Sequence, residues 1–302
     1  MTAMTGASPA TGMPPGVLAL RAWKPHVPGV REVLHAAFGA HVYPLHTHDT
    51  WTLFIVDEGA IQYDLGRREG RARPSMVSVL PPHVVHDGRP GAPGGYRKRV
   101  VYLEMDLIGE ALIGRAADRP VLPDPGLRAR VVALHEALEC IDDAFEAEVR
   151  LNAIAEQIRS SLGGPAPNGP TTSDPSDRPL AQRLRAELDA HLFERLTMAS
   201  AANAVGVDPT RLARAFARTF GIAPHAYVTG RRIDAARDRI LGGRPLADVA
   251  AEVGFADQAH LTRRFTAFLG VTPGRYQREA TPRLWSLDPR SISGRRGRTG
   301  GC

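Results

Sequence analysis

The sequence predicts an α+β multidomain protein, in which a β sandwich or barrel comes first and an all-α domain with two helix-turn-helix units comes last. Residues 30–106 alternate short apolar runs with Gly and Pro turns, which is typical of short antiparallel strands. Apolar residues then recur at helical spacing over residues 126–160. From residue 198 onward the chain contains an internal repeat, which is a strong signal of architecture.

Length and composition set the broad class. A chain of 302 residues suggests two domains, and its 43% hydrophobic and 23% charged content are ordinary for a globular protein. The longest apolar runs are far too short to span a membrane. Residues 1–17 lack the basic and apolar regions of a signal peptide, so we expect a disordered leader there. The two cysteines, Cys140 and Cys302, form no disulfide framework and favour a cytoplasmic protein.

Charge is distributed unequally between the two halves of the chain. From Arg178 to the end there are 21 arginines against 11 acidic residues, a net charge of +10. The first 177 residues hold 17 basic and 21 acidic residues, a net charge of −4. A basic C-terminal half suggests nucleic acid as its partner, although charge alone is a weak argument.

These patterns divide the chain into five parts. The leader is followed by a first domain at 18–160, a flexible Gly/Pro/Ser-rich linker at 161–179, a helical domain at 180–280 and a disordered Arg-rich tail at 281–302. The helices expected over 126–160 have two interpretations. They cover the barrel, or they pair with the same helices of a second subunit, and the sequence separates neither.

The repeat consists of residues 201–227 and residues 250–276. Seven positions coincide: Ala202, Gly206, Leu212, Phe216, Gly221, Pro224 and Tyr227 match Ala250, Gly254, Leu261, Phe265, Gly270, Pro273 and Tyr276. Each copy reads as two short helices joined at a glycine that can adopt positive φ. Asp208 and Asp257 are the expected N-caps of the second helices. These helices expose Thr, Gln and Arg, which suits contact with the DNA major groove.

The stretch VGFADQAHLTRRF followed by GVTPGRY is similar to the signature of the AraC/XylS transcription regulators, and the resemblance covers about residues 178–279. It implies two units joined by a central helix at about 225–241, with both recognition helices in successive major grooves of double-stranded DNA. The base-contacting positions that it implies are Thr210, Ala213, Arg214, Gln258, Ala259, Thr262 and Arg263. Arg211 and Arg264 are expected to contact phosphates, which position the protein without reading sequence.

The first domain resembles the sensor of this family, a cupin-like jelly roll, through PLHTHDTWTLFIVDEGAIQY and SVLPPHVVHDG. Strand alternation predicts that His46, His48 and Thr52 share one face. Metal-binding cupins add a carboxylate near position 52 or 53, where this chain has Thr52 and Leu53, so we expect no metal, although three imidazoles alone can hold zinc. We expect an effector pocket instead, or imidazoles that only hydrogen-bond to the barrel. The pocket residues would be His46, His48, Thr52, Phe54, Tyr63, His83 and His86.

The sequence therefore predicts a transcription regulator that binds DNA and an unknown small-molecule effector. No catalytic residue and no cofactor are expected. A homodimer is the expected assembly, RNA polymerase is a further candidate partner, and no membrane association is expected. Two alternatives stay open: a metal-dependent cupin enzyme fused to a DNA-binding domain, and a constitutive regulator whose cupin only dimerises.

Overall fold

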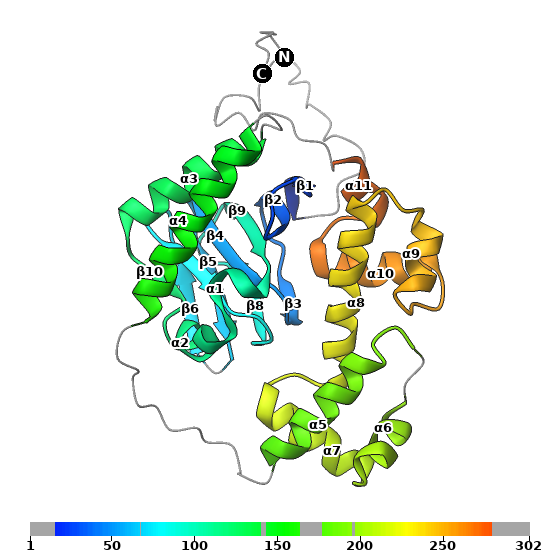
Figure 1. The fold of residues 1–302 in the computed structure, drawn as a ribbon. Coiled ribbons are helices and arrows are strands. Elements are labelled where there is room, and N and C mark those ends of the chain that lie inside the picture. The colour runs from blue at the N-terminus through cyan, green and yellow to red at the C-terminus, as the bar shows by residue number, and fades with distance from the viewer. Residues whose placement is uncertain (1–15, 67, 140–142, 164–176, 195–196, 280–302) are drawn as a thin grey trace, which may run out of the picture.

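The protein was studied as a computed structural model that describes residues 16–66, 68–139, 143–163, 177–194 and 197–279. Strands fill the first third of the chain and helices fill its C-terminal part (Figure 1), so the predicted fold class is confirmed. The predicted leader and tail, and most of the predicted linker, lie outside the described residues. None of the described helices is long and apolar enough to cross a membrane.

The first domain consists of two antiparallel sheets. The larger sheet has the order β1 (Val17–Trp23), β2 (Val30–Phe38), β9 (Tyr96–Leu103), β4 (Trp51–Gly59), β7 (Val77–Leu80) and β10 (Val121–Leu122). The smaller sheet has the order β3 (Tyr43–His46), β8 (His86–Pro90), β5 (Ile61–Leu65) and β6 (Arg68–Ala72). The two sheets do not close into one continuous barrel, but they are consistent with the predicted jelly roll. Strand β1 begins well before residue 30, where we expected the strands to start.

The segment from His46 to Phe54 is not the single strand that alternation predicted. β3 ends at His46 in the smaller sheet, where His46 pairs with His86 of β8. The chain then crosses to the larger sheet, and β4 begins at Trp51 and pairs with β7 and β9. His48 therefore lies in the crossing.

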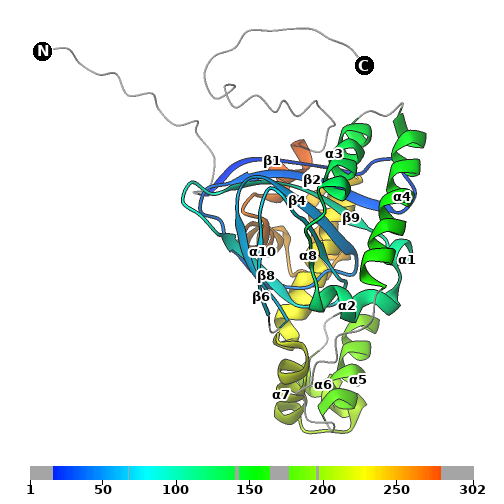
Figure 2. The same cartoon turned by 90° about the vertical axis from the view of Figure 1, so that its left-hand side faces the viewer.

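Helices cover the outer face of the larger sheet (Figure 2). They are α1 (Met105–Ile108), the 3₁₀ helix η1 (Glu110–Leu112), α2 (Ile113–Asp118), α3 (Pro125–Glu139) and α4 (Ala144–Leu162). Leu134 of α3 and Ile154 of α4 are fully buried in one core with Trp51 and Leu53 of β4. The interpretation that these helices cover the barrel therefore holds for one face of α4. Phe145 and Val149 lie on the other face and are 79% and 50% exposed.

The described residues from 177 onward form seven helices: α5 (Asp177–Ala190), α6 (Met198–Val205), α7 (Pro209–Phe220), α8 (Pro224–Leu241), α9 (Leu246–Glu252), α10 (Gln258–Leu269) and α11 (Pro273–Arg278). The predicted turns and caps are confirmed. Gly206 and Gly254 have φ of 72° and 78°, a region that glycine adopts without steric cost. The carboxylates of Asp208 and Asp257 accept hydrogen bonds from the first turns of α7 and α10.

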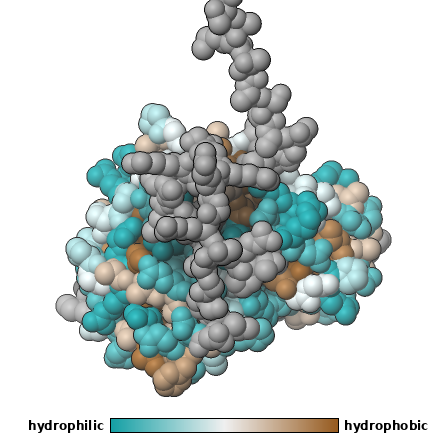
Figure 3. Space-filling view, turned by 90° about the horizontal axis from the view of Figure 1, so that it is seen from above, coloured by the Kyte–Doolittle hydropathy of each residue, from teal (hydrophilic) through white to brown (hydrophobic). Residues whose placement is uncertain are grey.

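The two helix-turn-helix units pack into different cores. The second unit (α9–α10), with α8 and α11, shares a continuous core with the strands. The first unit (α6–α7) packs with α5 in a separate cluster, to which the first domain contributes only Val85. Figure 1 shows the same division, with α5–α7 at one end of α8 and α9–α11 at the other. On the face seen in Figure 3, outside the grey atoms, hydrophobic residues are scattered among hydrophilic ones.

Candidate functional site

A cavity lies between the strands of the first domain and helices α8 and α10. Its empty volume, including space open to solvent, is about 670 Å³. The first domain contributes Tyr43, His46, His48, Thr52, Phe54, Ile61, Tyr63, Leu80, His86, Asp87, Gly88, Tyr96, Lys98, Val100 and Tyr102, and the two helices contribute Gly230, Ile233, Asp234, Arg237, Phe268 and Leu269. The cavity is thus a site shared by both domains. Largely apolar walls with a few converging polar groups are typical of small-molecule sites.

The structure brings six of the seven predicted pocket residues together in this cavity. They are His46, His48, Thr52, Phe54, Tyr63 and His86. His83 lies elsewhere, in a second depression beside Phe220 at the end of α7. Its Nδ1 lies 3.4 Å from Nη1 of Arg231, and it is the one described non-glycine residue with positive φ, at 62°. The geometry therefore places His83 at the contact between the domains and outside the cavity.

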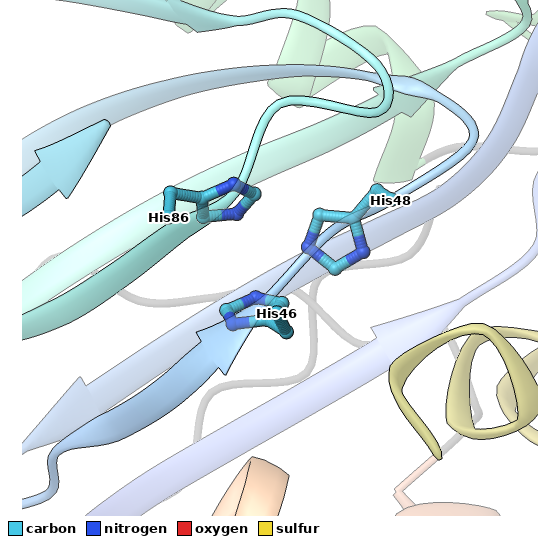
Figure 4. A group of neighbouring side chains, drawn as sticks. All are labelled: His46, His48 and His86. Carbon is cyan, nitrogen blue, oxygen red and sulfur yellow. The ribbon is translucent and has the colours of Figure 1, made fainter. Parts of the chain in front are cut away.

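Three of these histidines face one another (Figure 4). Their ring centroids are 4.4 to 5.1 Å apart, and one ring nitrogen of each lies within 4.8 Å of those of the other two. Each ring is held at Nδ1: His46 by the carbonyl of Pro44 at 2.6 Å, His86 by the carbonyl of Val84 at 3.0 Å, and His48 by the carboxylate of Asp234 at 2.8 Å. They come from β3, from β8 and from the crossing between the sheets.

The three imidazoles are neutral at neutral pH. Burial is the largest cause, and it lowers the pKa values of His46 and His48 well below the usual range. The neighbouring imidazoles lower these two pKa values further. Burial also lowers the pKa of His86 to about 4. A cluster of uncharged imidazoles can accept hydrogen bonds or coordinate a metal, but it supplies no positive charge.

The sequence reading missed Lys98, which extends from β9 into the cavity. Its Nζ lies 4.4 Å from the centre of the Tyr43 ring. Burial, with a smaller effect of Arg237, lowers the pKa of Lys98 to about 7. Within the described residues, no acidic group is among the causes of this shift. The signal in the sequence was a lysine in the apolar strand KRVVYL, in a chain with only one other lysine.

The sequence reading also missed the α8 wall. Asp234 and Arg237 both line the cavity, and burial raises the pKa of Asp234 to about 6. Nη2 of Arg237 donates to Oε1 of Glu32 on β2 at 2.6 Å, and the hydroxyl of Tyr276 donates to the same oxygen. Burial raises the pKa of Glu32, and the adjacent guanidinium opposes that shift. This buried network joins the first domain to α8 and α11.

The predicted DNA-contacting residues lie on two outward faces. Thr210, Arg211, Arg214, Gln258, Ala259, Arg263 and Arg264 are exposed, and Ala213 and Thr262 are partly exposed. On the opposite faces Leu212 and Phe216 of α7, and Leu261 and Phe265 of α10, are fully buried. The packing of the protein therefore leaves the outward faces of α7 and α10 accessible. Their contact with DNA stays a prediction.

Comparison with known families matches both halves of the chain. Residues 28–159 match the model of the AraC-like ligand binding domain, and residues 201–279 match that of a helix-turn-helix domain. A putative AraC-like transcription regulator of Streptomyces antibioticus is 37% identical over 28% of this chain and 29% of its own length. The regulatory protein PocR of Salmonella typhimurium is 26% identical over 50% of this chain and 49% of its own length. The chain thus spans less than half the length of these relatives.

Solved structures agree on the fold. The apo structure of a point variant of ToxT from Vibrio cholerae superposes with a TM-score of 0.56 over 87% of this chain and 97% of that chain, at 9% identity. The wild-type ToxT structure with a bound unsaturated fatty acid superposes with a TM-score of 0.53 over 90% of this chain and 98% of that chain, at 13% identity. At such low identity the likeness establishes the shared arrangement of strands and helices, and nothing about ligands.

Proposed function

Because the chain belongs to the AraC-like transcription regulators, we propose that it is a sequence-specific DNA-binding regulator controlled by a small molecule in the cavity. One observation carries this proposal: α8, the helix between the two helix-turn-helix units, forms a wall of the cavity through Gly230, Ile233, Asp234 and Arg237. If the two domains can adopt more than one arrangement, a ligand that contacts α8 binds these arrangements with different affinities. Such a difference in affinity is what shifts an equilibrium between arrangements.

The chemistry of the cavity suggests an effector with an apolar body and an anionic group. Phe54, Tyr63 and Phe268 supply apolar and aromatic surface, and the imidazoles are neutral. Lys98 also lines the cavity, and because burial lowers its pKa to about 7, an anionic group beside it would favour its charged form. An unsaturated fatty acid, the ligand in one ToxT structure, has this general chemistry, which is consistent with the proposal.

DNA recognition is assigned to α7 and α10, which would enter successive major grooves. Arg214 and Arg263 are the strongest candidates for base readout, since arginine pairs with guanine through two hydrogen bonds. Arg211 and Arg264 would contact phosphates, which adds affinity that falls steeply with salt. Alanines at 213 and 259 limit readout to few side chains.

A homodimer is part of the proposal. Phe145 and Val149 form an apolar, exposed stripe on α4, on the face that does not cover the sheet. Pairing of α4 with its copy would remove this stripe from water. The proposal requires no catalysis, and the relatives named above are regulators.

Selection of bound sequences from a random DNA pool tests the function directly. We expect the full chain to enrich a motif with two parts one helical turn apart, and its affinity to fall as salt rises. A pool that stays random, or an affinity that does not change with salt, would contradict the proposal. Melting of the protein with a panel of fatty acids and other organic acids would then test the effector class, because a ligand of the native state raises Tm.

A further inference from the structure

The three cavity histidines are oriented as metal ligands are. A carbonyl oxygen can only accept a hydrogen bond, so Nδ1 of His46 and of His86 must carry the proton that each ring donates. Nδ1 of His48 donates to a carboxylate in the same way. In each neutral ring the lone pair then lies on Nε2. We propose that His46, His48 and His86 bind one divalent transition-metal ion of the zinc class through these three nitrogens.

The distances suit this site. Tetrahedral zinc binds imidazole nitrogen at about 2.0–2.1 Å, which places ligand nitrogens about 3.4 Å apart. One ring nitrogen of each histidine lies within 4.8 Å of those of the other two, which is close to this spacing.

The structure also supplies the second layer of contacts that a metal site needs. Ligating histidines nearly always donate their other ring N–H to a carboxylate or a backbone carbonyl, which fixes the tautomer and the ring orientation. Two carbonyls and Asp234 do this here. The carboxylate that was absent from positions 52 and 53 thus comes from α8, 186 residues from His48, and it acts on a ligand and not on the metal.

The charges around the site do not exclude a cation. Arg237 forms a buried ion pair with Glu32 at 2.6 Å and lies 3.3 Å from Asp234, so two carboxylates offset its charge. The carboxylate of Asp234 also lies 2.8 Å from Nδ1 of His48, which brings negative charge next to the site. Three imidazoles suit zinc, cobalt, nickel, copper or ferrous iron. Three protein ligands leave one position of a tetrahedral ion for solvent or for an anionic effector.

A metal here would connect the sensor to the DNA-binding part. The ion would hold His48, and His48 holds Asp234 of α8. Loss of the ion would free the ring and weaken this contact. This regulatory role rests on the proposed function, whereas the metal site itself does not.

Cobalt titration of the full, chelator-stripped chain tests the site, because tetrahedral Co²⁺ has intense visible absorption. We expect one Co²⁺ per chain, displaced by Zn²⁺. His86→Ala and His86→Gln should each weaken binding about 100-fold or more. His83→Asn is the matched control, since asparagine tolerates positive φ, and it should bind like the wild type. No tetrahedral spectrum, or equal binding by the His86 variants, would overturn the site.

A second measurement needs no variant. X-ray absorption at the zinc edge of the loaded wild-type chain should show three imidazole nitrogens, and a shell containing sulfur or only oxygen would overturn the assignment. Asp234→Asn should retain the spectrum and weaken binding about 10–100-fold. DNA selection with the same samples separates the two ideas. A chain that binds Co²⁺ and no DNA would refute the proposed function alone, and one that binds DNA and no metal would refute the site alone.

Discussion

The two helix-turn-helix units are copies of one motif in unequal surroundings. Each turns at a glycine with positive φ, begins its second helix at a capping aspartate, and buries one phenylalanine completely. Each is followed by a tyrosine at the same place in the repeat, Tyr227 or Tyr276. The hydroxyl of Tyr227 donates to Asp189 of α5 at 2.7 Å, whereas the hydroxyl of Tyr276 donates to Glu32 of the first domain.

This difference shows that the copies have divided their roles. The second unit shares its core with the strands, and Phe268 and Leu269 of its α10 line the cavity. The first unit is supported by α5, including the ion pair between Asp177 and Arg218 at 2.8 Å. A ligand in the cavity would therefore contact the second unit directly, whereas the first unit is connected to the cavity through α8 and touches the first domain near Val85.

The largest expected effect on the free energy of unfolding comes from truncating the two buried phenylalanines to alanine. Phe265→Ala and Phe216→Ala should each cost about 3–5 kcal/mol, because both side chains are fully buried. The location of the damage should differ. Hydrogen exchange should speed up in the strands and the second unit for Phe265→Ala, and in α5–α7 alone for Phe216→Ala. If both substitutions speed up exchange in the same helices and strands, the two cores are not separate.

The next largest effect is expected from substituting the carboxylates that accept hydrogen bonds from Tyr276 and Tyr227. Glu32→Gln removes the nearer of two carboxylates beside buried Arg237, with Asp234 remaining at 3.3 Å, and should lower the free energy of unfolding by about 3 kcal/mol. Asp189→Asn, the matched change at the first unit, should cost about 1 kcal/mol or less, since the amide oxygen can still accept the bond from Tyr227 and only the charge is lost. Urea denaturation measures both. Similar losses would mean that the link between the domains contributes no more than the local contact.

At the DNA, Arg214→Ala and Arg263→Ala should each cost about 1–3 kcal/mol of binding free energy and relax base preference at their own positions. Because the second unit contacts the cavity, the cost of Arg263→Ala should change when effector is added, while that of Arg214→Ala should change less. Titrations of labelled DNA at fixed salt provide the measurement. An unchanged motif for both variants would remove α7 and α10 from the readout.

The smallest effect concerns pH. The pKa of Lys98 falls from 10.5 to about 7 on folding, so the unfolded chain binds this proton more tightly. Charged Lys98 therefore destabilises the fold fully below about pH 7, and the penalty disappears as pH rises to about 10.5. Because the side chain is partly open to the cavity, we expect Lys98→Met to stabilise by only about 1 kcal/mol at pH 7. Urea denaturation of both proteins at the two ends of this pH range should show that the stability gained by Lys98→Met becomes smaller as pH rises. A gain independent of pH would show that the ammonium is not desolvated.

Local patterns were enough to predict the helical half. The repeat, Gly206, Gly254 and the capping aspartates depend on contacts within one turn of helix, so spacing alone located the units and their outward faces. The prediction of the pocket brought six residues to the cavity; alternation along β4 explains Thr52 and Phe54, whereas His48 lies in the crossing, outside any strand. It misplaced His83, which sits at a turn with positive φ that alternation does not describe.

What the sequence by itself determined is therefore the two units, the strand-rich first domain and the presence of His46, His48 and His86 in one wall. Only the tertiary structure decided that these rings converge across a crossing between two sheets, and that α8 closes the cavity with Asp234 and Arg237. The physical reason is distance along the chain: His48 and Asp234 are 186 residues apart, and Glu32 and Arg237 are 205 apart. Such pairs form where two domains dock, and docking leaves no periodic signal in either segment.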